Sequence, residues 1–280
     1  MIRIAILLTV FNRKKQTLQC LKNIEEQTIH TNDKVKIDIF LTNDGCTDGT
    51  PEAIRVQFPY VKIIEGDGSL FWNRGMYEAW QEAAKGDYDF YLWLNDDTFL
   101  YQDTISRLIA NSKQHNDRSI ILGSTCDTET KSRITYGGLD RKRATVHSTT
   151  EFLPCFYMHG NIVLIPMYVF EQIGFNDTYY RHSLGDHDYG LMAQKKGIKV
   201  LVSPGVYGEC DVHATISKWK NPQVPLKERW KAMFKPTGQN PFEFFHFRKK
   251  HFGLTPACKT FMTMFIHLLF PSMWKHDDCR

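Results

Sequence analysis

Residues 90–98 decide the fold, and they read Phe90-Tyr91-Leu92-Trp93-Leu94-Asn95-Asp96-Asp97-Thr98. Five apolar residues in a row are typical of a strand that is buried on both faces of a parallel sheet. Such a strand rarely stops on adjacent carboxylates unless a cation binds there. In open α/β sheets the ligand crevice lies beyond the carboxyl ends of the strands. The stretch therefore predicts that Asn95, Asp96 and Asp97 face a binding site and that the chain is an enzyme.

Apolar runs of strand length alternate with helical patterns on both sides of this stretch. We expect strands over residues 2–8, 37–42, 61–64, 90–94, 120–124, 161–165 and 198–202, and helices over 14–27, 75–85, 103–111, 166–173 and 186–196. A further helix is expected to begin with Thr50 as its N-cap and Pro51 as its first residue. The polar residues 126–150 predict loops or a hairpin. This alternation predicts an α/β fold with a mostly parallel sheet between two layers of helices.

Charge divides the chain into a body and an extension. Residues 214–280 contain 12 Lys and Arg against 4 Asp and Glu, whereas residues 1–213 contain 23 against 27. The composition after residue 213 is rich in Lys, Trp, Pro and Phe, so we place a domain boundary near residue 214. A net charge of +4 and a pI of 8.6 are mild, and no nucleic-acid-binding module is recognisable, so we expect no nucleic-acid partner.

The cysteines and the N-terminus indicate a reducing compartment. The 7 cysteines are odd in number and include no Cys-x-x-Cys pair, which argues against a disulfide framework or a zinc site. The apolar run of residues 2–10 is too short to span a bilayer and is followed by Asn12-Arg13-Lys14-Lys15 instead of a cleavage site. We therefore expect a cytoplasmic protein that is not secreted.

The extension combines aromatic residues with cations. Residues 242–252 read FEFFHFRKKHF, and an apolar run over 261–274 is shorter than the ~20 residues that a spanning helix needs. One interpretation is a helical segment that lies on the anionic inner face of the cytoplasmic membrane. The alternative is that these side chains cap the core or form a homodimer interface.

Two further acidic groups follow predicted strands or precede a predicted helix. The loop of residues 42–50 contains Asp44 and Gly45, which could accept the imide N–H of a pyrimidine base and allow close approach of the nucleotide, or could be ordinary turn residues. Asp186 directly precedes a helix and could take a proton from an attacking hydroxyl, or could be only an N-cap. His213 follows the last strand of the body and is either a structural histidine, as a lone histidine more often is, or the best candidate to complete a metal shell, which would favour Mn²⁺ somewhat over Mg²⁺.

Taken together, these groups resemble glycosyltransferase family 2 on a GT-A fold. The resemblance covers residues 3–213 and is carried, in chain order, by Val10-Phe11-Asn12-Arg13, residues 43–50, Asn73-Arg74-Gly75, Asn95-Asp96-Asp97, Gly160-Asn161, residues 173–176, Gly185-Asp186-His187-Asp188 and His213. It is closest to the branch that includes rhamnosyltransferases of bacterial surface polysaccharides. It implies a Rossmann-like GT-A domain over residues 1–213, with a nucleotide-sugar-binding half over 1–125, an acceptor-binding half over 126–213 and the basic, aromatic helical extension after it.

The resemblance also implies a role for each matching residue. Asp97 would bind Mn²⁺ or Mg²⁺, and Asp186 would be the general base of an inverting transfer. Asn95 replaces the family's usual Asp, and Gly185 replaces its Glu, so that Asp188 would partly substitute. The residues implied to contact a UDP- or dTDP-sugar are Thr9, Asn12, Arg13, Asp44, Asn73, Arg74, Asn95 and Asp96. Those implied for the acceptor or sugar pocket are Trp72, His159, Gly160 and Asp188, although Trp72 could equally be a core residue.

The function implied is transfer of a sugar from a UDP- or dTDP-sugar to a glycan or lipid-linked acceptor. A sugar nucleotidyltransferase would need a glycine-rich phosphate loop near the N-terminus, and residues 10–15 contain no glycine. The remaining alternative is a non-catalytic protein that binds a nucleotide sugar, and Gly185 and Asn95 are the two departures that favour it.

Overall fold

The computed structural model describes residues 1–28, 35–212 and 217–273. These residues form two compact units, which are described separately. The first comprises Met1–Thr178 and Asp186–Val212, and the second comprises Tyr179–Gly185 together with the described residues after 213. The segment Tyr179–Gly185 thus packs with the extension, although we predicted a single boundary near residue 214.

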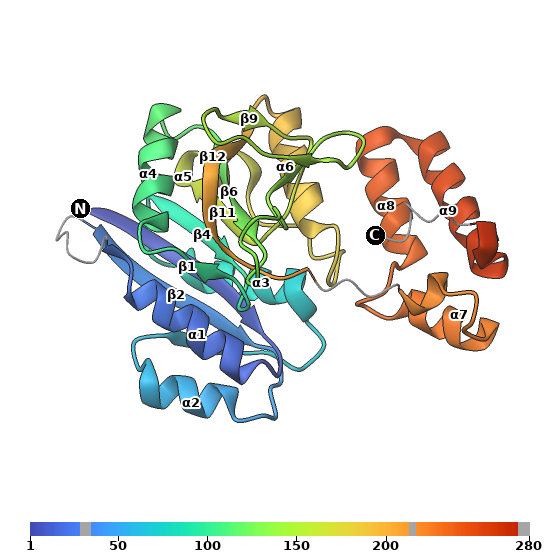
Figure 1. The fold of residues 1–280 in the computed structure, drawn as a ribbon, viewed down its shortest axis with the longest axis horizontal. Coiled ribbons are helices and arrows are strands. Elements are labelled where there is room, and N and C mark those ends of the chain that lie inside the picture. Colours follow the sequence, from blue (N-terminus) through green and yellow to red (C-terminus); the bar gives the residue numbers. More distant parts are fainter. Residues whose placement is uncertain (29–34, 213–216, 274–280) are drawn as a thin grey trace. The chain divides into compact units, whose positions relative to one another are not determined.

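A large mixed sheet forms the centre of the first unit (Figure 1). Across the sheet its strands are β3 (Lys62–Glu65), β2 (Val35–Asn43), β1 (Ile2–Val10), β4 (Phe90–Leu94), β11 (Ile162–Pro166), β6 (Ile120–Cys126), β12 (Val200–Glu209) and β5 (Phe99–Leu100), with β9 (Leu153–Pro154) paired to β12. A small second sheet contains β10 (Tyr157–Met158), β7 (Gly138–Leu139) and β8 (Thr145–Val146).

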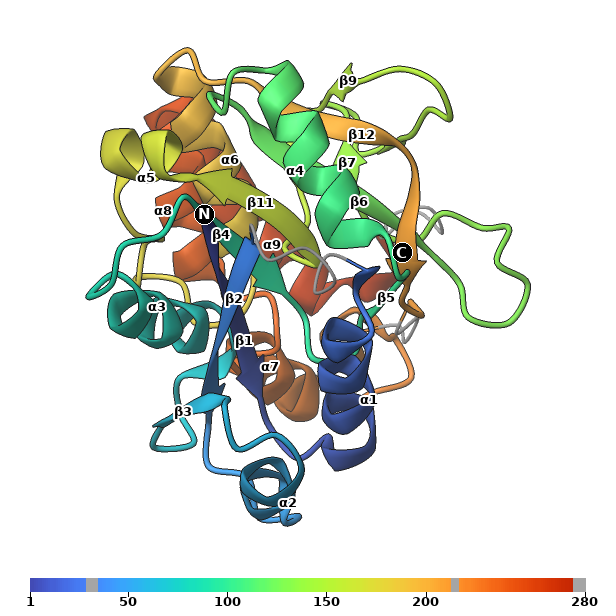
Figure 2. The same cartoon turned by 90° about the vertical axis from the view of Figure 1, so that its left-hand side faces the viewer.

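Six helices cover the two faces of the large sheet in the described part of the first unit (Figure 2). Side chains that alternate along β1 point to opposite faces, so Ile4 and Ile6 pack on one side and Ala5 and Leu7 on the other. The first face holds α1 (Lys14–Glu25), α2 (Thr50–Gln57) and α4 (Thr104–Gln114). The second holds α3 (Phe71–Ala83), α5 (Met167–Ile173) and α6 (Gly185–Lys195). The predicted α/β fold with a mostly parallel sheet is confirmed.

Strand direction brings distant segments to one edge of the sheet. β1, β2 and β4 run parallel, so their carboxyl ends at Val10, Asn43 and Leu94 lie together. β11 runs antiparallel to β4, with Ile162 opposite Leu94, and therefore begins at this edge. The residues before β11, including Gly160, consequently lie beside those that follow β4.

Three local predictions were wrong in their boundaries or roles. The N-cap of α2 is Gly49 with a φ of 77°, and Thr50 is the first helical residue, whose N–H is accepted by Asp48 Oδ1 at 3.1 Å. Helix α3 begins at Phe71, one turn before residue 75. The N–H groups at its start are accepted by the carboxylate of Asp44, which lies outside the helix. Strand β12 continues seven residues beyond Val202 to Glu209, through register shifts between Val202 and Gly208.

The second unit is helical and has its own small core. Its elements are two short 3₁₀ turns (Lys218–Lys220 and Pro271–Met273), α7 (Leu226–Phe234), α8 (Pro241–Phe252) and α9 (Leu254–Leu269). Trp219, Met233, Met264 and Leu268 are buried together. Arg181 pairs with Glu243 at 2.9 Å, and this ion pair attaches the segment Tyr179–Gly185 to α8. No helix among the described residues is both long and apolar enough to cross a membrane.

Candidate active site

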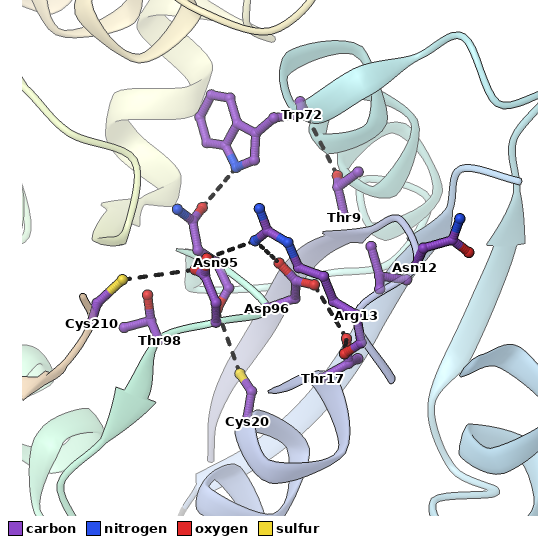
Figure 3. A network of polar contacts seen from close by, with 12 residues as sticks. Thr9, Asn12, Arg13, Thr17, Cys20, Trp72, Asn95, Asp96, Thr98 and Cys210 are labelled. Carbon is purple, nitrogen blue, oxygen red and sulfur yellow. Dashed lines mark hydrogen bonds and ion pairs between the residues drawn. The ribbon is translucent and has the colours of Figure 1, made fainter. Parts of the chain in front are cut away.

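The acids after β4 are paired with an arginine from the loop after β1. Arg13 Nη1 lies 3.1 Å from Asp96 Oδ1 (Figure 3). The same nitrogen lies 2.6 Å from Asp97 Oδ2. The Thr17 hydroxyl donates a second hydrogen bond to Asp96 Oδ2 at 3.2 Å. The structure therefore brings together Arg13, Asp96 and Asp97, which the sequence predicted for one site from positions more than eighty residues apart.

Burial sets the electrostatics of this cluster. Asp96 is only 4% exposed, and desolvation raises its pKa to about 7, although the neighbouring Arg13 charge acts in the opposite direction. Burial also disfavours the charge of Arg13, but Asp96 and Asp97 more than offset this effect and raise the pKa of the guanidinium. The charge of Arg13 thus favours the ionised form of Asp96 against the effect of burial.

Trp72 connects the residues after β4 to the start of β11. Its indole Nε1 donates to Asn95 Oδ1 at 2.7 Å (Figure 3). Its ring packs edge-on to Trp93 with centroids 5.8 Å apart. A Cβ on Gly160 would lie 2.4 Å from Trp72 Cζ2, so only glycine allows this close approach. Trp72 accordingly contacts both Asn95 and the backbone next to the predicted base.

Asp186 is held at the first turn of α6. Its Oδ2 accepts the Gly160 N–H at 3.1 Å, and its Oδ1 accepts the His187 N–H at 2.8 Å. The side chain is 19% exposed, so it reaches solvent at this edge of the sheet. Asp188, two residues further along the helix, is completely buried.

Two histidines lie beside Asp186. The His159 and His187 rings are 5.7 Å apart, and His187 Nδ1 lies 2.8 Å from the Met158 carbonyl oxygen. Burial lowers the pKa of His159 to about 4, and burial likewise lowers that of His187. Both imidazoles are therefore neutral near pH 7.

Asp44 organises the loop that leads into α3. Its Oδ1 accepts the N–H groups of Gly68 (2.9 Å) and Leu70 (3.1 Å), and its Oδ2 accepts that of Phe71 (2.7 Å). A carboxylate from the end of β2 thus satisfies the free donors at the helix start, as a local N-cap would. Asp44 is 2% exposed, and the predicted contact with a pyrimidine base stays a prediction.

The other predicted nucleotide residues surround this loop. Thr9 Oγ1 donates to the Trp72 carbonyl oxygen at 3.5 Å, and Asn12 Oδ1 accepts the Thr47 N–H at 2.7 Å. Asn73 is completely buried and donates to the Asp177 carbonyl oxygen at 2.9 Å, while Arg74 Nε donates to that of Thr178 at 2.9 Å. Asn73 and Arg74 thus hold residues 177–178 against α3, and their contacts with a nucleotide stay predictions.

The comparisons with known proteins agree with this arrangement. The family model described as glycosyl transferase family 2 matches residues 5–174, which is more than half of the chain. The chain belongs to glycosyl transferase family 2. No curated protein matches this chain at a significant level.

Solved structures of glycosyltransferases share the fold of this family 2 enzyme. S. aureus TarS superposes with a TM-score of 0.61 at 11% identity, over 96% of this chain and 55% of that chain. TarS 1-349 in complex with UDP-GlcNAc gives 0.59 at 10% identity, over 96% and 92%. The mannosyltransferase PcManGT from Pyrobaculum calidifontis, in complex with GDP-Man and Mn²⁺, gives 0.54 at 14% identity, over 97% and 81%. This glycosyltransferase therefore spans about half the length of the first of these chains.

The donor set of the glycosyltransferase suits a cation that is shared with a diphosphate. No group of three or more His, Cys, Asp or Glu residues among those that the structure describes could hold a metal alone. Mg²⁺ commonly binds one or two protein carboxylates and completes its shell with water and substrate phosphates. Asp97, whose side chain is 14% exposed beside Asp96, fits that mode. The predicted ligand His213 lies outside the described residues.

Three residues of the site were not predicted from the sequence. Thr17 donates to Asp96, and the Cys20 thiol donates to the Asn95 carbonyl oxygen at 3.6 Å (Figure 3). The Cys210 thiol donates to Asp97 Oδ1 at 3.8 Å. Burial raises the pKa of both thiols, so they are uncharged donors. The position of Cys210 directly after β12 was the available signal, but our predicted strand ended too early to use it.

Proposed function

We propose that this glycosyltransferase moves a sugar, with inversion, from a UDP- or dTDP-sugar to a hydroxyl of a glycan or lipid-linked acceptor in surface polysaccharide synthesis. The observation that carries the proposal is the link through Trp72. Trp72 hydrogen-bonds Asn95 in the acidic group and packs against Gly160, whose N–H binds Asp186. A donor-side acid group and a candidate base are thereby positioned by one side chain.

The proposed mechanism assigns proton transfer to Asp186. Its carboxylate, oriented by the Gly160 and His187 N–H groups, would take the proton of the acceptor hydroxyl as that oxygen attacks the anomeric carbon. Attack opposite the leaving diphosphate inverts that carbon, and the anomer of the product, read by NMR, tests this. Arg74 and Arg13 are the residues available to contact the diphosphate.

The proposed cofactor is Mn²⁺ or Mg²⁺, held by Asp97 and by the predicted ligand His213. When bound, such a cation neutralises charge that develops on the leaving diphosphate. The structures of TarS with UDP and with UDP-GlcNAc, and of PcManGT with GDP-Man and Mn²⁺, support a nucleotide-sugar donor in general. We retain a pyrimidine nucleotide because Asp44 lies at the end of β2, where the family resemblance places the base.

Calorimetry with UDP and dTDP, with and without Mn²⁺, tests the donor site. We expect wild type to bind one of the two nucleotides more tightly in the presence of Mn²⁺. In Asp97→Ala, Mn²⁺ should no longer change the nucleotide affinity. Binding of GDP alone would exclude the pyrimidine assignment, and absence of binding by any nucleotide would overturn the donor site. Consumption of the bound donor in the presence of acceptor separates the enzyme from the alternative, a non-catalytic nucleotide-sugar-binding protein.

We further propose that the second unit attaches the enzyme to the anionic inner face of the cytoplasmic membrane. Residues 217–273 contain ten Lys and Arg against two Asp and Glu. Large apolar side chains of α9 are exposed at helical spacing, including Leu254, Met262, Ile266 and Leu269. Apolar insertion combined with positive charge is what binds a helix to anionic lipid.

Sedimentation with vesicles tests this attachment. We expect the protein to sediment with phosphatidylglycerol vesicles at low salt and not with phosphatidylcholine vesicles. Met262→Asp with Ile266→Asp should abolish sedimentation, whereas Val56→Asp, which changes an exposed apolar residue in the first unit, should not. A protein that stays in solution and scatters light as a dimer would support the homodimer interface instead.

A further inference from the structure

Arg13 occupies the carboxylate that the proposed cation needs. A single nitrogen, Nη1, contacts Asp97 Oδ2 at 2.6 Å and Asp96 Oδ1 at 3.1 Å. The acids are 14% and 6% exposed at their side chains, whereas the arginine side chain is 41% exposed. The guanidinium therefore reaches from solvent onto two largely buried acids.

The backbone of Arg13 is anchored at the start of α1, whereas 41% of its side chain is exposed to solvent. Its carbonyl oxygen accepts the Thr17 N–H at 2.9 Å and the Thr17 hydroxyl at 2.9 Å, which anchors the residue at the first turn of α1. Solvent lies beside the long side chain, so a second position of the guanidinium would need no cavity inside the protein. Movement of the guanidinium alone would uncover Asp97 without disturbing β1 or α1.

We infer that Arg13 is an internal counter-ion of Asp96 and Asp97 in the donor-free enzyme, and that a divalent cation binds Asp97 only by displacing it. The inference rests on the proposed cation-dependent transfer and adds a control on its metal affinity. Two positive groups cannot share Asp97 Oδ2 without strong repulsion, since a cation ligand distance is near 2 Å and the guanidinium lies 2.6 Å away on the same oxygen.

The displaced guanidinium has a use in the same site. Arginine forms planar, bidentate hydrogen bonds with phosphate, so a donor diphosphate offers Arg13 a new partner when the cation takes the old one. Binding of the cation and binding of the nucleotide are then linked, because each removes part of the obstacle to the other. The donor-free enzyme consequently holds a divalent cation weakly.

Manganese binding to the donor-free protein tests the inference. Free Mn²⁺ would be counted by electron paramagnetic resonance for wild type, Arg13→Ala, Arg13→Gln and Arg55→Ala. Arg55 is the matched control, since its Nη2 lies 2.6 Å from Glu65 Oε1 in an exposed ion pair away from the acids. We expect both Arg13 variants to bind Mn²⁺ about tenfold more tightly than wild type, which is about 1.4 kcal/mol, and Arg55→Ala to match wild type.

A second readout guards against misfolding of Arg13→Ala. Without metal, thermal melting should show a lower Tm for both Arg13 variants than for wild type, because two buried carboxylates lose their cation. Saturating Mn²⁺ should raise the Tm of the Arg13 variants by more than it raises the Tm of wild type. Arg13→Gln removes the positive charge but keeps an N–H donor for the carboxylates. We expect it to fold even if Arg13→Ala does not.

The outcomes separate this inference from the proposed function. Equal or weaker Mn²⁺ binding by the Arg13 variants overturns the inference, as does absence of Mn²⁺ binding by every variant at millimolar concentrations, even if UDP still binds. Tighter binding by the Arg13 variants supports it, even if no nucleotide binds and the donor-site proposal fails.

Discussion

Trp72 Nε1 donates a 2.7 Å hydrogen bond to Asn95 Oδ1, so the asparagine that stands where the family usually has an aspartate is oriented by an indole. Trp72→Phe removes this donor and leaves the amide oxygen without it. We expect a loss of about 1 kcal/mol in the free energy of unfolding and weaker nucleotide binding, measured by urea denaturation and calorimetry.

Trp93→Phe is the matched control for this effect. Trp93 packs against Trp72, and its Nε1 has no hydrogen-bond partner within the described part of the chain. It should lose stability through packing while nucleotide affinity stays unchanged. If Trp72→Phe and Trp93→Phe weaken nucleotide binding equally, the hydrogen bond to Asn95 has no part in the site.

Asp44→Asn tests the carboxylate that starts α3. Both oxygens of Asp44 accept backbone N–H groups, so an amide would point its NH₂ at a donor in either orientation. We expect a loss of about 1–3 kcal/mol in urea denaturation. Asp67→Asn, which changes an exposed acid in the same loop, should leave the unfolding midpoint near that of wild type.

The loop geometry explains how far the sequence could predict this site. Strand ends are recognisable from apolar runs that stop at polar residues, and the run 90–94 placed Asn95, Asp96 and Asp97 correctly at the end of β4. The start of α3 was predicted late, because its capping group is Asp44, which precedes Phe71 by 27 residues. Capping by a distant carboxylate leaves no signal in the local sequence.

Pairing across the sheet is the second feature that the sequence could not reveal. Strand β11 has the same buried, apolar character as its neighbours β4 and β6, and nothing in its side chains indicates that it runs antiparallel to both. That direction places Gly160 beside Trp72 and Asp186. The contact of Arg13 with Asp96 and Asp97 depends likewise on side-chain conformation, whereas the family resemblance identified these residues only as members of one site.

Asp186→Asn should separate catalysis from donor binding. The amide cannot accept a proton from the acceptor hydroxyl, so we expect kcat to fall by about 10²–10⁴-fold, with nucleotide affinity within about twofold of wild type. The substitution also places an NH₂ against the Gly160 or His187 N–H, so stability should be checked by thermal melting.

Asp127→Asn supplies the comparison for Asp186→Asn. Asp127 also accepts backbone N–H groups, from Thr130 and Arg133, but in an exposed loop. It should keep full turnover in an assay of nucleoside diphosphate release in the presence of acceptor. Retention of most of the turnover by Asp186→Asn would remove Asp186 from the base role.

Stability should fall in acid partly through His159. Burial lowers the pKa of His159 from 6.5 to about 4, so between these values the unfolded chain binds a proton that the folded chain does not. The contribution of His159 to the free energy of unfolding is therefore complete above about pH 6.5 and is lost as the pH falls toward about 4. The whole shift corresponds to roughly 3 kcal/mol. His187, whose pKa burial also lowers, acts in the same direction. Urea denaturation at a series of pH values should show a shallower decline for His159→Gln than for wild type, and parallel declines would mean that His159 is protonated as readily in the folded enzyme as in the unfolded chain.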